Sequence, residues 1–388
     1  MSSSAASRRA STIPGHHTIG NYDVISKLAT GGMGEVYLAK QRGPVAFSRD
    51  VVLKKLHPSF TDDPHFVEMF INEAKLSATL THPNIIHIYE LFEDDGYVMA
   101  MEYVRGGTVL RLLRAAASAG GAVPYGPALR IAIGVCEALH HAYNSPDDVG
   151  APHRIVHRDV SPSNILVSYD GQVKLADFGV AKAIDVNMTQ GTSVKGKYGY
   201  LSPEQLRCHS LDQRSDLFSL GVVLWEMTTG RSLFRRDNDV AMMYALVEES
   251  IPRPSQKVAD YPPELEAIVM KALERDREMR YDGGLELAND LRRVAHELGW
   301  DIEGSALAQL VRDQVPDDQV AFGRIGSDKF TGPETPRPRA SESYDVVAVE
   351  LDTPVLRKPT RRRAVVVTTG VMVLLTLVFW LLIVPRLI

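Results

Sequence analysis

The segment HRDVSPSN, residues 157–164, most constrains what this chain can fold into, because it sets charged and amide side chains between two apolar runs. Asp159 and Asn164 lie five positions apart, so one loop must present a carboxylate and a carboxamide together. A second carboxylate, Asp177, ends the strand-like run in VKLADFG. Magnesium prefers oxygen ligands, usually one or two carboxylates plus substrate phosphates. Asn164 and Asp177 therefore predict a magnesium site for a phosphate-bearing ligand.

Two patterns nearer the N-terminus predict phosphate binding. The segment LATGGMGEVYLAK at 28–40 sets glycines between strand-like runs, and glycine lets backbone N–H groups approach phosphates closely. In VVLKKL at 51–56, Lys54 and Lys55 face opposite sides of a strand, so only one of them can point toward the glycines. Glu73 borders the apolar face of a predicted helix, where its carboxylate can reach a lysine.

The coarse pattern divides the chain into a sheet-rich part and a larger helical part. Residues 21–56 predict short antiparallel strands, and residues 62–80 predict a helix that starts behind an Asp-Asp-Pro cap. Residues 84–104 predict two strands joined at Asp94-Asp95-Gly96. From residue 107 to about 299 the pattern is mostly helical. We therefore expect an α+β fold.

Taken in order, these segments resemble the eukaryotic-type (Hanks-type) protein kinases. The matching elements are a Gly-rich loop, a VAIK-like strand, a helix glutamate, HRD…N, DFG, an APE-like SPE and a C-terminal arginine. The resemblance covers roughly residues 20–298 and implies a small antiparallel-sheet N-lobe with its αC helix (about 20–104) and a mainly helical C-lobe (about 105–298). It also implies protein kinase activity with ATP and Mg²⁺, or Mn²⁺ in its place.

The resemblance implies a role for each matching residue. Lys54 would bind the α- and β-phosphates and pair with Glu73, while Asp159 would orient the substrate hydroxyl as the catalytic base. Asn164 and Asp177 would hold magnesium. The glycine loop, the strands that sandwich adenine, the gatekeeper and the hinge would supply the nucleotide pocket: Leu28, Ala29, Gly31, Gly34, Val36, Val52, Met101, Glu102, Tyr103, Val104 and Leu166.

Supporting roles follow from the same resemblance. Glu204 of SPE would pair with Arg280, and Asp216 would brace the catalytic loop from behind. Arg158 needs an anionic partner, which a phosphate on the loop between DFG and SPE would supply. We therefore predict activating autophosphorylation on this loop, at one or more of Thr189, Thr192 and Ser193, whereas a solvated polar loop is the alternative.

The chain departs from the family pattern at five positions. Ala29 replaces the first glycine, Val52 replaces an alanine of the nucleotide pocket, and Ser202 replaces the alanine of APE, all with little expected effect. Ser161 replaces a lysine that in similar kinases contacts the transferred phosphate. Lys197 stands where those kinases have a threonine that bonds this lysine. In this chain the lysine and the hydroxyl residue have therefore exchanged positions, which makes Lys197 a candidate catalytic cation. Alternatively, Lys197 is solvated and Ser161 fills space.

Residues 364–384 form an uncharged apolar run, which as a helix is about 31 Å long and matches a hydrocarbon core of about 30 Å. Basic residues gather on its N-terminal side, which predicts a transmembrane helix with the kinase domain in the cytoplasm, as at a bacterial inner membrane. A buried soluble helix is the alternative. Around this run we expect a disordered N-terminus (1–19), a C-terminal extension with a flexible tether and basic juxtamembrane segment (299–363), and an external tail (385–388).

Two functional classes fit the motifs: an active serine/threonine kinase acting on proteins and on itself, and a membrane-tethered pseudokinase that serves as a binding scaffold. The presence of Lys54, Asp159, Asn164 and Asp177 favours the enzyme. Tyrosine specificity is a third, weaker option. The net charge of −5 does not indicate nucleic-acid binding, and a homodimer is compatible with the sequence.

Overall fold

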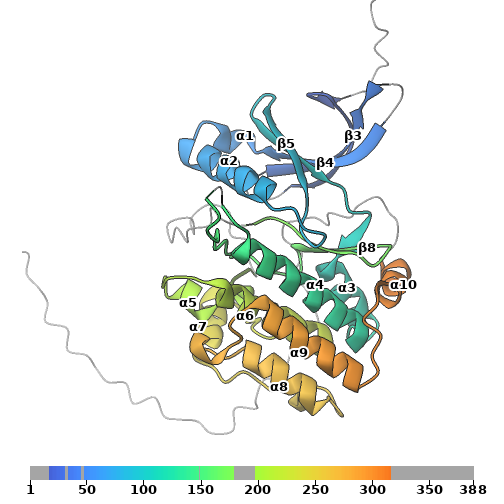
Figure 1. Cartoon of the computed structure of the whole chain (residues 1–388), viewed down its shortest axis with the longest axis vertical. Helices are drawn as coiled ribbons and strands as arrows, with labels where there is room; N and C mark the ends of the chain where they lie inside the picture. Colours follow the sequence, from blue (N-terminus) through green and yellow to red (C-terminus); the bar gives the residue numbers. More distant parts are fainter. Residues whose placement is uncertain (1–16, 31–33, 45–47, 148, 179–196, 316–388) are drawn as a thin grey trace, which may run out of the picture. The chain divides into compact units, whose positions relative to one another are not determined.

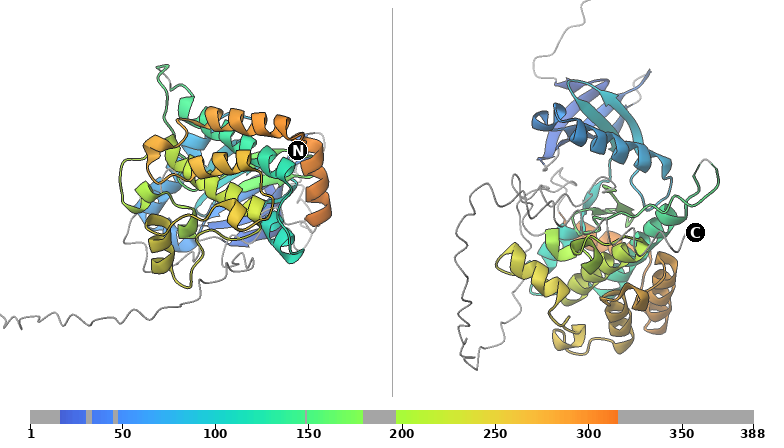
Figure 2. Two further views of the ribbon diagram at one scale, coloured as in Figure 1. Left: turned by 90° about the horizontal axis from the view of Figure 1, so that it is seen from below. Right: turned by 90° about the vertical axis from the view of Figure 1, so that its left-hand side faces the viewer.

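The structure is a computed structural model that describes residues 17–30, 34–44, 48–147, 149–178 and 197–315. Within these residues the chain forms a sheet-rich lobe as far as Glu102 and a mostly helical lobe after it (Figure 1). The right-hand view of Figure 2, turned by 90° about the vertical axis, shows the same division. The expected two-lobed α+β architecture is confirmed.

The N-lobe sheet is antiparallel, with six strands in the order β1-β2-β3-β4-β6-β5. Its strands are β1 (Thr18–Ile19), β2 (Tyr22–Thr30), β3 (Gly34–Arg42), β4 (Ser48–Leu56), β5 (Ile88–Glu93) and β6 (Tyr97–Glu102). The predicted turn between β5 and β6 has positive φ at Asp95 and Gly96, which glycine adopts without strain. Strand β1 lies within the segment 1–19 that was expected to lack structure, because its backbone pairs with β2.

Two helices, α1 (Pro58–Thr61) and α2 (Pro64–Thr79), follow β4. The predicted cap is present: the Asp63 carboxylate accepts a hydrogen bond from the His65 N–H at 3.0 Å, and proline takes the first helical position. The buried face of α2 contains Met69, Phe70 and Glu73, and the helix contacts β5 and β6. This packing points a carboxylate from α2 toward the sheet.

The C-lobe is built around α6 (Gln213–Thr229), in which every residue from Ser215 to Thr229 is buried. The surrounding helices are α3 (Val109–Ser118), α4 (Tyr125–Asn144), α5 (Pro203–Leu206), α7 (Asp239–Val247), α8 (Pro263–Ala272), α9 (Gly284–Glu297) and α10 (Gly304–Gln314), with short 3₁₀ turns η3 (Lys197–Tyr200), η4 (Pro254–Gln256) and η5 (Arg277–Met279). Gly230 ends α6 in the left-handed conformation, with φ of 66°.

A second antiparallel sheet has the strand order β7-β8-β9, and the loop 157–164 leads directly into β8. Its strands are β7 (Gly106–Thr108), β8 (Ile165–Ser168) and β9 (Val173–Leu175), the last of which is the strand-like run in VKLADFG. A Cβ on Gly106 would lie 2.0 Å from the Val167 carbonyl oxygen, so only glycine fits this approach of β7 to β8.

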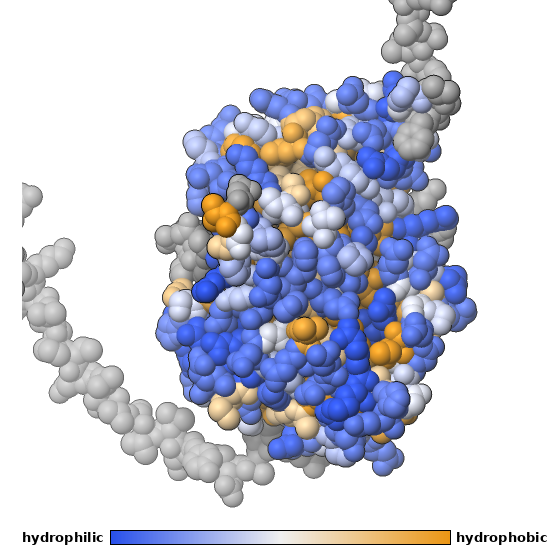
Figure 3. Space-filling view, viewed as in Figure 1, coloured by the Kyte–Doolittle hydropathy of each residue, from blue (hydrophilic) through white to orange (hydrophobic). Residues whose placement is uncertain are grey.

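Apolar side chains fill the interior of both lobes, and the face seen in Figure 3 is mainly hydrophilic with small separate apolar groups. Large exposed apolar residues are scattered over several elements, as with Val240, Tyr244 and Met279. The N-lobe core residues divide between the two faces of the sheet, and one of these clusters continues into the second sheet.

Folded structure continues past residue 298, where the kinase domain was expected to end. Helix α10 lies in the segment 299–363, and its residues Leu307, Ala308 and Val311 are buried against the C-lobe. The proposed tether, the basic segment and the apolar run at 364–384 lie outside the described residues. Within the described ranges, no helix is long and apolar enough to cross a membrane.

Candidate active site

Lys54 lies at the centre of the predicted site. Its strand, β4, pairs with β3 and β6, and its ammonium Nζ lies 2.7 Å from Glu73 Oε1 on α2 and 2.8 Å from Asp177 Oδ1 after β9. The three side chains are largely buried, at 15%, 11% and 31% exposed respectively. One lysine thus joins the sheet, α2 and the VKLADFG segment, and the predicted Lys54–Glu73 pair is present.

The two neighbouring lysines are clearly distinguished. Lys55 points to the other side of β4 and lies 3.7 Å from Asp95, whose side chain is fully solvent-exposed. For Lys54, burial alone would lower the pKa, but the carboxylates of Asp177 and Glu73 outweigh burial and raise it. Lys54 therefore stays a cation throughout the physiological pH range.

The loop 157–164 is held from below by Asp216 of α6. The Asp216 carboxylate accepts hydrogen bonds from the backbone N–H groups of His157 (2.7 Å) and Arg158 (2.8 Å), and Arg158 has a positive φ of 66°. Burial raises the pKa of Asp216 to about 7, although the two N–H groups oppose this shift. Asp216 therefore holds the loop 157–164 from behind, as predicted.

The buried His157 ring fixes the segment that leads to Asp177. Its Nε2 lies 3.0 Å from the Ala176 carbonyl oxygen, and its ring packs on Phe178 with centroids 4.6 Å apart. Asp177 itself has φ of 58°, in the left-handed region that is costly for a residue other than glycine. These contacts and the bond to Lys54 hold the carboxylate in that conformation.

Asn164 contacts Asp159, and its backbone is bonded to the residue before Asp177. The Asn164 Nδ2 donates to both the carbonyl oxygen and the Oδ2 of Asp159, each at 2.8 Å. The Ala176 N–H donates to the Asn164 carbonyl oxygen at 2.9 Å, which brings the residue before Asp177 beside Asn164. The asparagine thus orients the Asp159 carboxylate, and its backbone lies beside the residue that precedes Asp177.

This donor set fits a magnesium ion bound with a nucleotide. The bonds of Asn164 to Asp159 use its amide nitrogen and leave its amide oxygen as a ligand atom, while Asp177 supplies a carboxylate oxygen. Magnesium is commonly held by one or two protein oxygens together with substrate phosphates. Lys54 adds a fixed positive charge on the same side for those phosphates.

The predicted adenine pocket is a single apolar cluster formed by residues from both lobes. Its members from the predicted set are Leu28, Ala29, Val36, Val52, Met101, Val104 and Leu166, all buried. Ala29 fits in β2 without positive φ, as expected. Gly34 lies in β3, where a Cβ would come 2.4 Å from the Lys55 carbonyl oxygen, whereas Gly31 lies outside the described residues.

The side chain of Glu102 has a role that sequence reasoning missed. It forms an ion pair with Lys174 of β9 at 2.8 Å, and its Oε2 also accepts from the His87 N–H at 3.2 Å. The hinge strand is therefore tied to the strand that leads to Asp177. A lysine within the buried run VKL was the available signal, but its partner lies 72 residues away in sequence.

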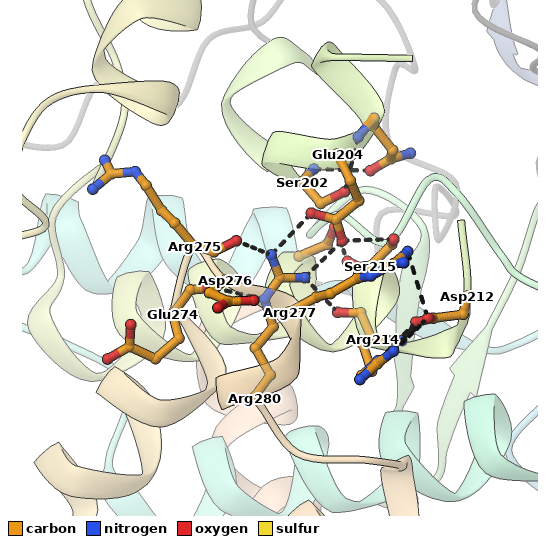
Figure 4. Close-up of polar contacts among 12 residues, drawn as sticks. Ser202, Glu204, Asp212, Arg214, Ser215, Glu274, Arg275, Asp276, Arg277 and Arg280 are labelled. Carbon is orange, nitrogen blue, oxygen red and sulfur yellow. Dashed lines mark hydrogen bonds and ion pairs between the residues drawn. The ribbon is translucent and has the colours of Figure 1, made fainter. Parts of the chain in front are cut away.

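Glu204 and Arg280 form the predicted buried pair (Figure 4). Two parallel bonds join them, from Nη1 to Oε1 at 2.6 Å and from Nη2 to Oε2 at 2.9 Å. Burial alone would raise the pKa of Glu204, but Arg280 and the Ser215 hydroxyl outweigh it and hold the pKa below its ordinary value. Ser202 caps α5 by accepting from the Gln205 N–H, so the SPE serine has a structural use.

Of the remaining predicted residues, the structure describes Ser161 fully and the others in part or not at all. Ser161 is buried, and its hydroxyl lies 2.9 Å from that of Ser163, which fits the space-filling alternative. Lys197 begins η3, but its side chain lies outside the described residues, so the exchange of roles with Ser161 stays a prediction. The candidate phosphorylation sites Thr189, Thr192 and Ser193 lie outside them too.

Comparisons with known proteins agree with the kinase-like arrangement of these residues. The family model for the protein kinase domain matches residues 22–289. The chain belongs to the protein kinase family.

Curated relatives are bacterial kinases. The tyrosine-protein kinase MasK of Myxococcus xanthus is 40% identical over 325 residues, which is 83% of this chain and 49% of that protein. The serine/threonine-protein kinase PknB of Mycolicibacterium smegmatis is 38% identical over 72% of this chain and 44% of its own length. This chain thus spans about half the length of the curated relatives it matches.

A solved structure gives the same result for the fold. The PknI kinase domain of Mycobacterium tuberculosis aligns over 74% of this chain and its own full length, with 26% identity and a TM-score of 0.56. The kinase fold predicted from the sequence is confirmed by this likeness and by the family match.

Proposed function

We propose that this chain transfers the γ-phosphate of Mg-ATP to serine and threonine hydroxyls of proteins, including its own. The observation that supports this most is the joint placement of Lys54 between Glu73 and Asp177, with Asn164 bonded to Asp159. These are the groups that phosphoryl transfer requires, assembled from four separate elements.

Each residue has a defined part in the reaction. The apolar cluster between the lobes receives the base, and Lys54 holds the phosphates through a charge that Glu73 fixes in position. Asp159 accepts the hydrogen bond of the attacking hydroxyl and aligns it with the terminal phosphorus. Asn164 and Asp177 hold magnesium, which neutralises the charge on the phosphates when bound. Catalysis in this scheme is mainly alignment and charge stabilisation.

A pseudokinase scaffold is the main alternative. A scaffold of this class keeps the fold while losing one of the groups that orient nucleotide or metal. In this chain all four groups are present: Lys54 contacts Asp177, Asn164 bonds Asp159, and the backbone of Ala176, next to Asp177, bonds the Asn164 carbonyl oxygen. The enzyme is therefore the better proposal.

Tyrosine specificity is the second candidate, and one observation favours it: the relative with 40% identity is named a tyrosine kinase. The relatives named serine/threonine kinases, at 34–38% identity, favour the first proposal. Phosphoamino-acid analysis after incubation of the chain with Mg-ATP separates the candidates. Phosphoserine and phosphothreonine support transfer to serine and threonine, phosphotyrosine alone supports tyrosine specificity, and no incorporation of phosphate supports the pseudokinase scaffold.

We also propose that residues 364–384 anchor the chain in a membrane, as at a bacterial inner membrane, with the kinase domain on the cytoplasmic side. The uncharged run and the preceding basic residues, among them Arg361, Arg362 and Arg363, support this proposal.

A homodimer is part of the same proposal, since a membrane concentrates copies of the chain. Cross-linking at membrane-like concentrations tests it.

A further inference from the structure

The stretch from Trp300 to Val315, here named the C-terminal brace, lies beyond the part of the chain that matches the family model, which ends at residue 289. It contains α10, which contacts α3, α4, β7 and β8 at the side of the C-lobe (Figures 1 and 2). The Trp300 ring stacks on Tyr125 of α4 with centroids 4.7 Å apart. Val315 is buried. The brace is therefore packed into the C-lobe along its whole length.

The brace contacts the β8–β9 hairpin at both ends of α10. At the beginning of the helix, Gly304 abuts the hairpin turn so closely that a Cβ on Gly171 would lie 1.9 Å from the Gly304 carbonyl oxygen. At the end, Arg312 Nη1 donates to the Tyr169 carbonyl oxygen at 2.6 Å. The Tyr169 hydroxyl donates to the Val315 carbonyl oxygen at 3.1 Å. Both bonds meet at one residue of the hairpin.

Tyr169 also connects the brace to the exit of the hinge. Its backbone N–H donates to the Arg105 carbonyl oxygen at 2.9 Å, directly after Val104 of the adenine pocket. A Cβ on Gly107 would lie 2.8 Å from Val315 Cγ1, so Val315 rests on the next strand, β7. The brace thus contacts β7 and the β8–β9 hairpin, both next to the adenine pocket.

The clamped hairpin carries the groups that would hold Mg-ATP. Leu166 of β8 belongs to the adenine cluster, and Asn164 directly precedes this strand. Asp177 follows β9 by two positions. A shift of the hairpin therefore moves the pocket and both magnesium ligands together, and sub-ångström placement matters for such groups.

We propose that Tyr169, Arg312 and Val315 are positioning residues, through which the C-terminal brace holds the β8–β9 hairpin and the hinge exit in the arrangement that binds Mg-ATP. This inference rests on the proposed function, because it concerns the same cleft. The residues act through Leu166 and the hairpin backbone.

The test uses the full chain and two substitutions with matched controls. Tyr169→Phe removes the hydroxyl bond to Val315, and Tyr261→Phe is its control, because the Tyr261 hydroxyl bonds Thr228 inside the C-lobe at 2.9 Å. Arg312→Gln removes the bond to Tyr169. Its control is Arg293→Gln, since Arg293 is an exposed arginine of α9 that pairs with Glu297.

We expect each brace variant to raise the KM for ATP, and the Kd for Mg-ATP measured by calorimetry, by about threefold to tenfold, which is the effect of one lost hydrogen bond. The kcat at saturating ATP should stay within about twofold of the wild type. Arg312→Lys, which keeps a donor, should restore much of the affinity. Melting temperatures identify any variant that fails to fold. If Arg312→Gln fails to fold, Arg312→Lys still tests the contact with Tyr169.

Two outcomes would overturn the inference: unchanged KM and Kd in both brace variants, or an equal rise in the controls. Failure of the proposed function would look different, because the wild-type chain itself would then bind no Mg-ATP or transfer no phosphate. Calorimetry on the wild-type chain separates the two, since binding without transfer leaves the inference testable.

Discussion

At the residue scale, Lys54 is the position where charge matters most, because its ammonium is shared by two largely buried carboxylates. We predict that Lys54→Met lowers phosphoryl transfer by at least about a hundredfold, as expected when a preorganised charge at the phosphates is lost. The measurement is turnover of Mg-ATP, with circular dichroism to verify the fold.

Lys55→Met is the matched control for this substitution, because Lys55 faces the exposed Asp95 on the other side of β4. Turnover in this control should stay within about twofold of the wild type. Near wild-type turnover in Lys54→Met would exclude the assigned role of Lys54.

The Glu204–Arg280 pair permits a prediction about stability. Glu204→Gln leaves a buried guanidinium without its carboxylate, which typically costs about 3–5 kcal/mol of unfolding free energy. Glu278→Gln is the control, because the Glu278 side chain is 64% exposed where it pairs with Arg214, so its loss should cost under about 1 kcal/mol. Urea denaturation of both variants at neutral pH measures the difference.

The pH dependence of this effect has a definite sign. Because the folded-state pKa of Glu204 lies below its ordinary value of 4.5, its contribution is present above that pH and is lost as the pH falls. The stability gap between wild type and Glu204→Gln should therefore narrow from pH 5 toward pH 3. A gap that stays constant over this range would contradict the ion-pair account.

Single residues also show the limit of sequence reasoning. The pattern of VVLKKL left Lys54 and Lys55 open, and only the family resemblance selected Lys54, which in the structure contacts Glu73. Its partner Asp177 lies 123 positions away, and the Glu102–Lys174 pair spans 72. Contacts over such separations depend on tertiary packing, which periodicity and local spacing do not encode.

At the scale of elements, the loop between DFG and SPE carries the predicted phosphorylation sites. We predict that the active protein carries phosphate on Thr189, Thr192 or Ser193, because Arg158 is a cation next to the catalytic aspartate and phosphate adds charge-assisted bonds. Mass spectrometry of protein incubated with Mg-ATP is the measurement. Asp159→Asn, prepared in the same way, is the control and should lack these phosphates.

Fully active protein without phosphate on this loop would refute the prediction. A replacement of all three residues by alanine tests the functional consequence, since activity should fall while the described core, which excludes this loop, keeps its melting temperature.

Most elements followed from local patterns. The Asp-Asp-Pro cap, the Asp94-Asp95-Gly96 turn and the alternating strands were predictable because each depends on neighbouring residues. Helix α10 was missed although Leu307, Ala308 and Val311 lie on one face, because a short amphipathic run after the expected domain end has no local feature that distinguishes it from a linker. What stabilises it is contact with β8 and α4, elements distant in sequence.

At the scale of the whole molecule, catalysis and anchoring should be separable. We predict that deletion of residues 357–388 yields a soluble protein with unchanged turnover, because the described lobes contain the complete predicted nucleotide site apart from the glycine turn at 31–33. Fractionation of cells that express the full and shortened chains, together with a kinase assay, tests this. A shortened chain that remains in the membrane fraction without aggregating would overturn the anchor at 364–384.

The order of seven motifs predicted the two-lobed architecture, and the family match confirmed it. The sequence could not indicate where the packed structure ends, since α10 lies beyond every motif.

The most direct test of the central claim, that this cleft is a working phosphotransfer site, compares nucleotide binding with turnover in Asp159→Asn. Asp159 accepts a hydrogen bond from Asn164 and is proposed to align only the attacking hydroxyl, so Mg-ATP affinity should stay within about threefold of the wild type. Turnover should fall by at least about a hundredfold. Asp177→Asn should instead weaken Mg-ATP binding as well as turnover. Wild-type turnover in Asp159→Asn would contradict the account.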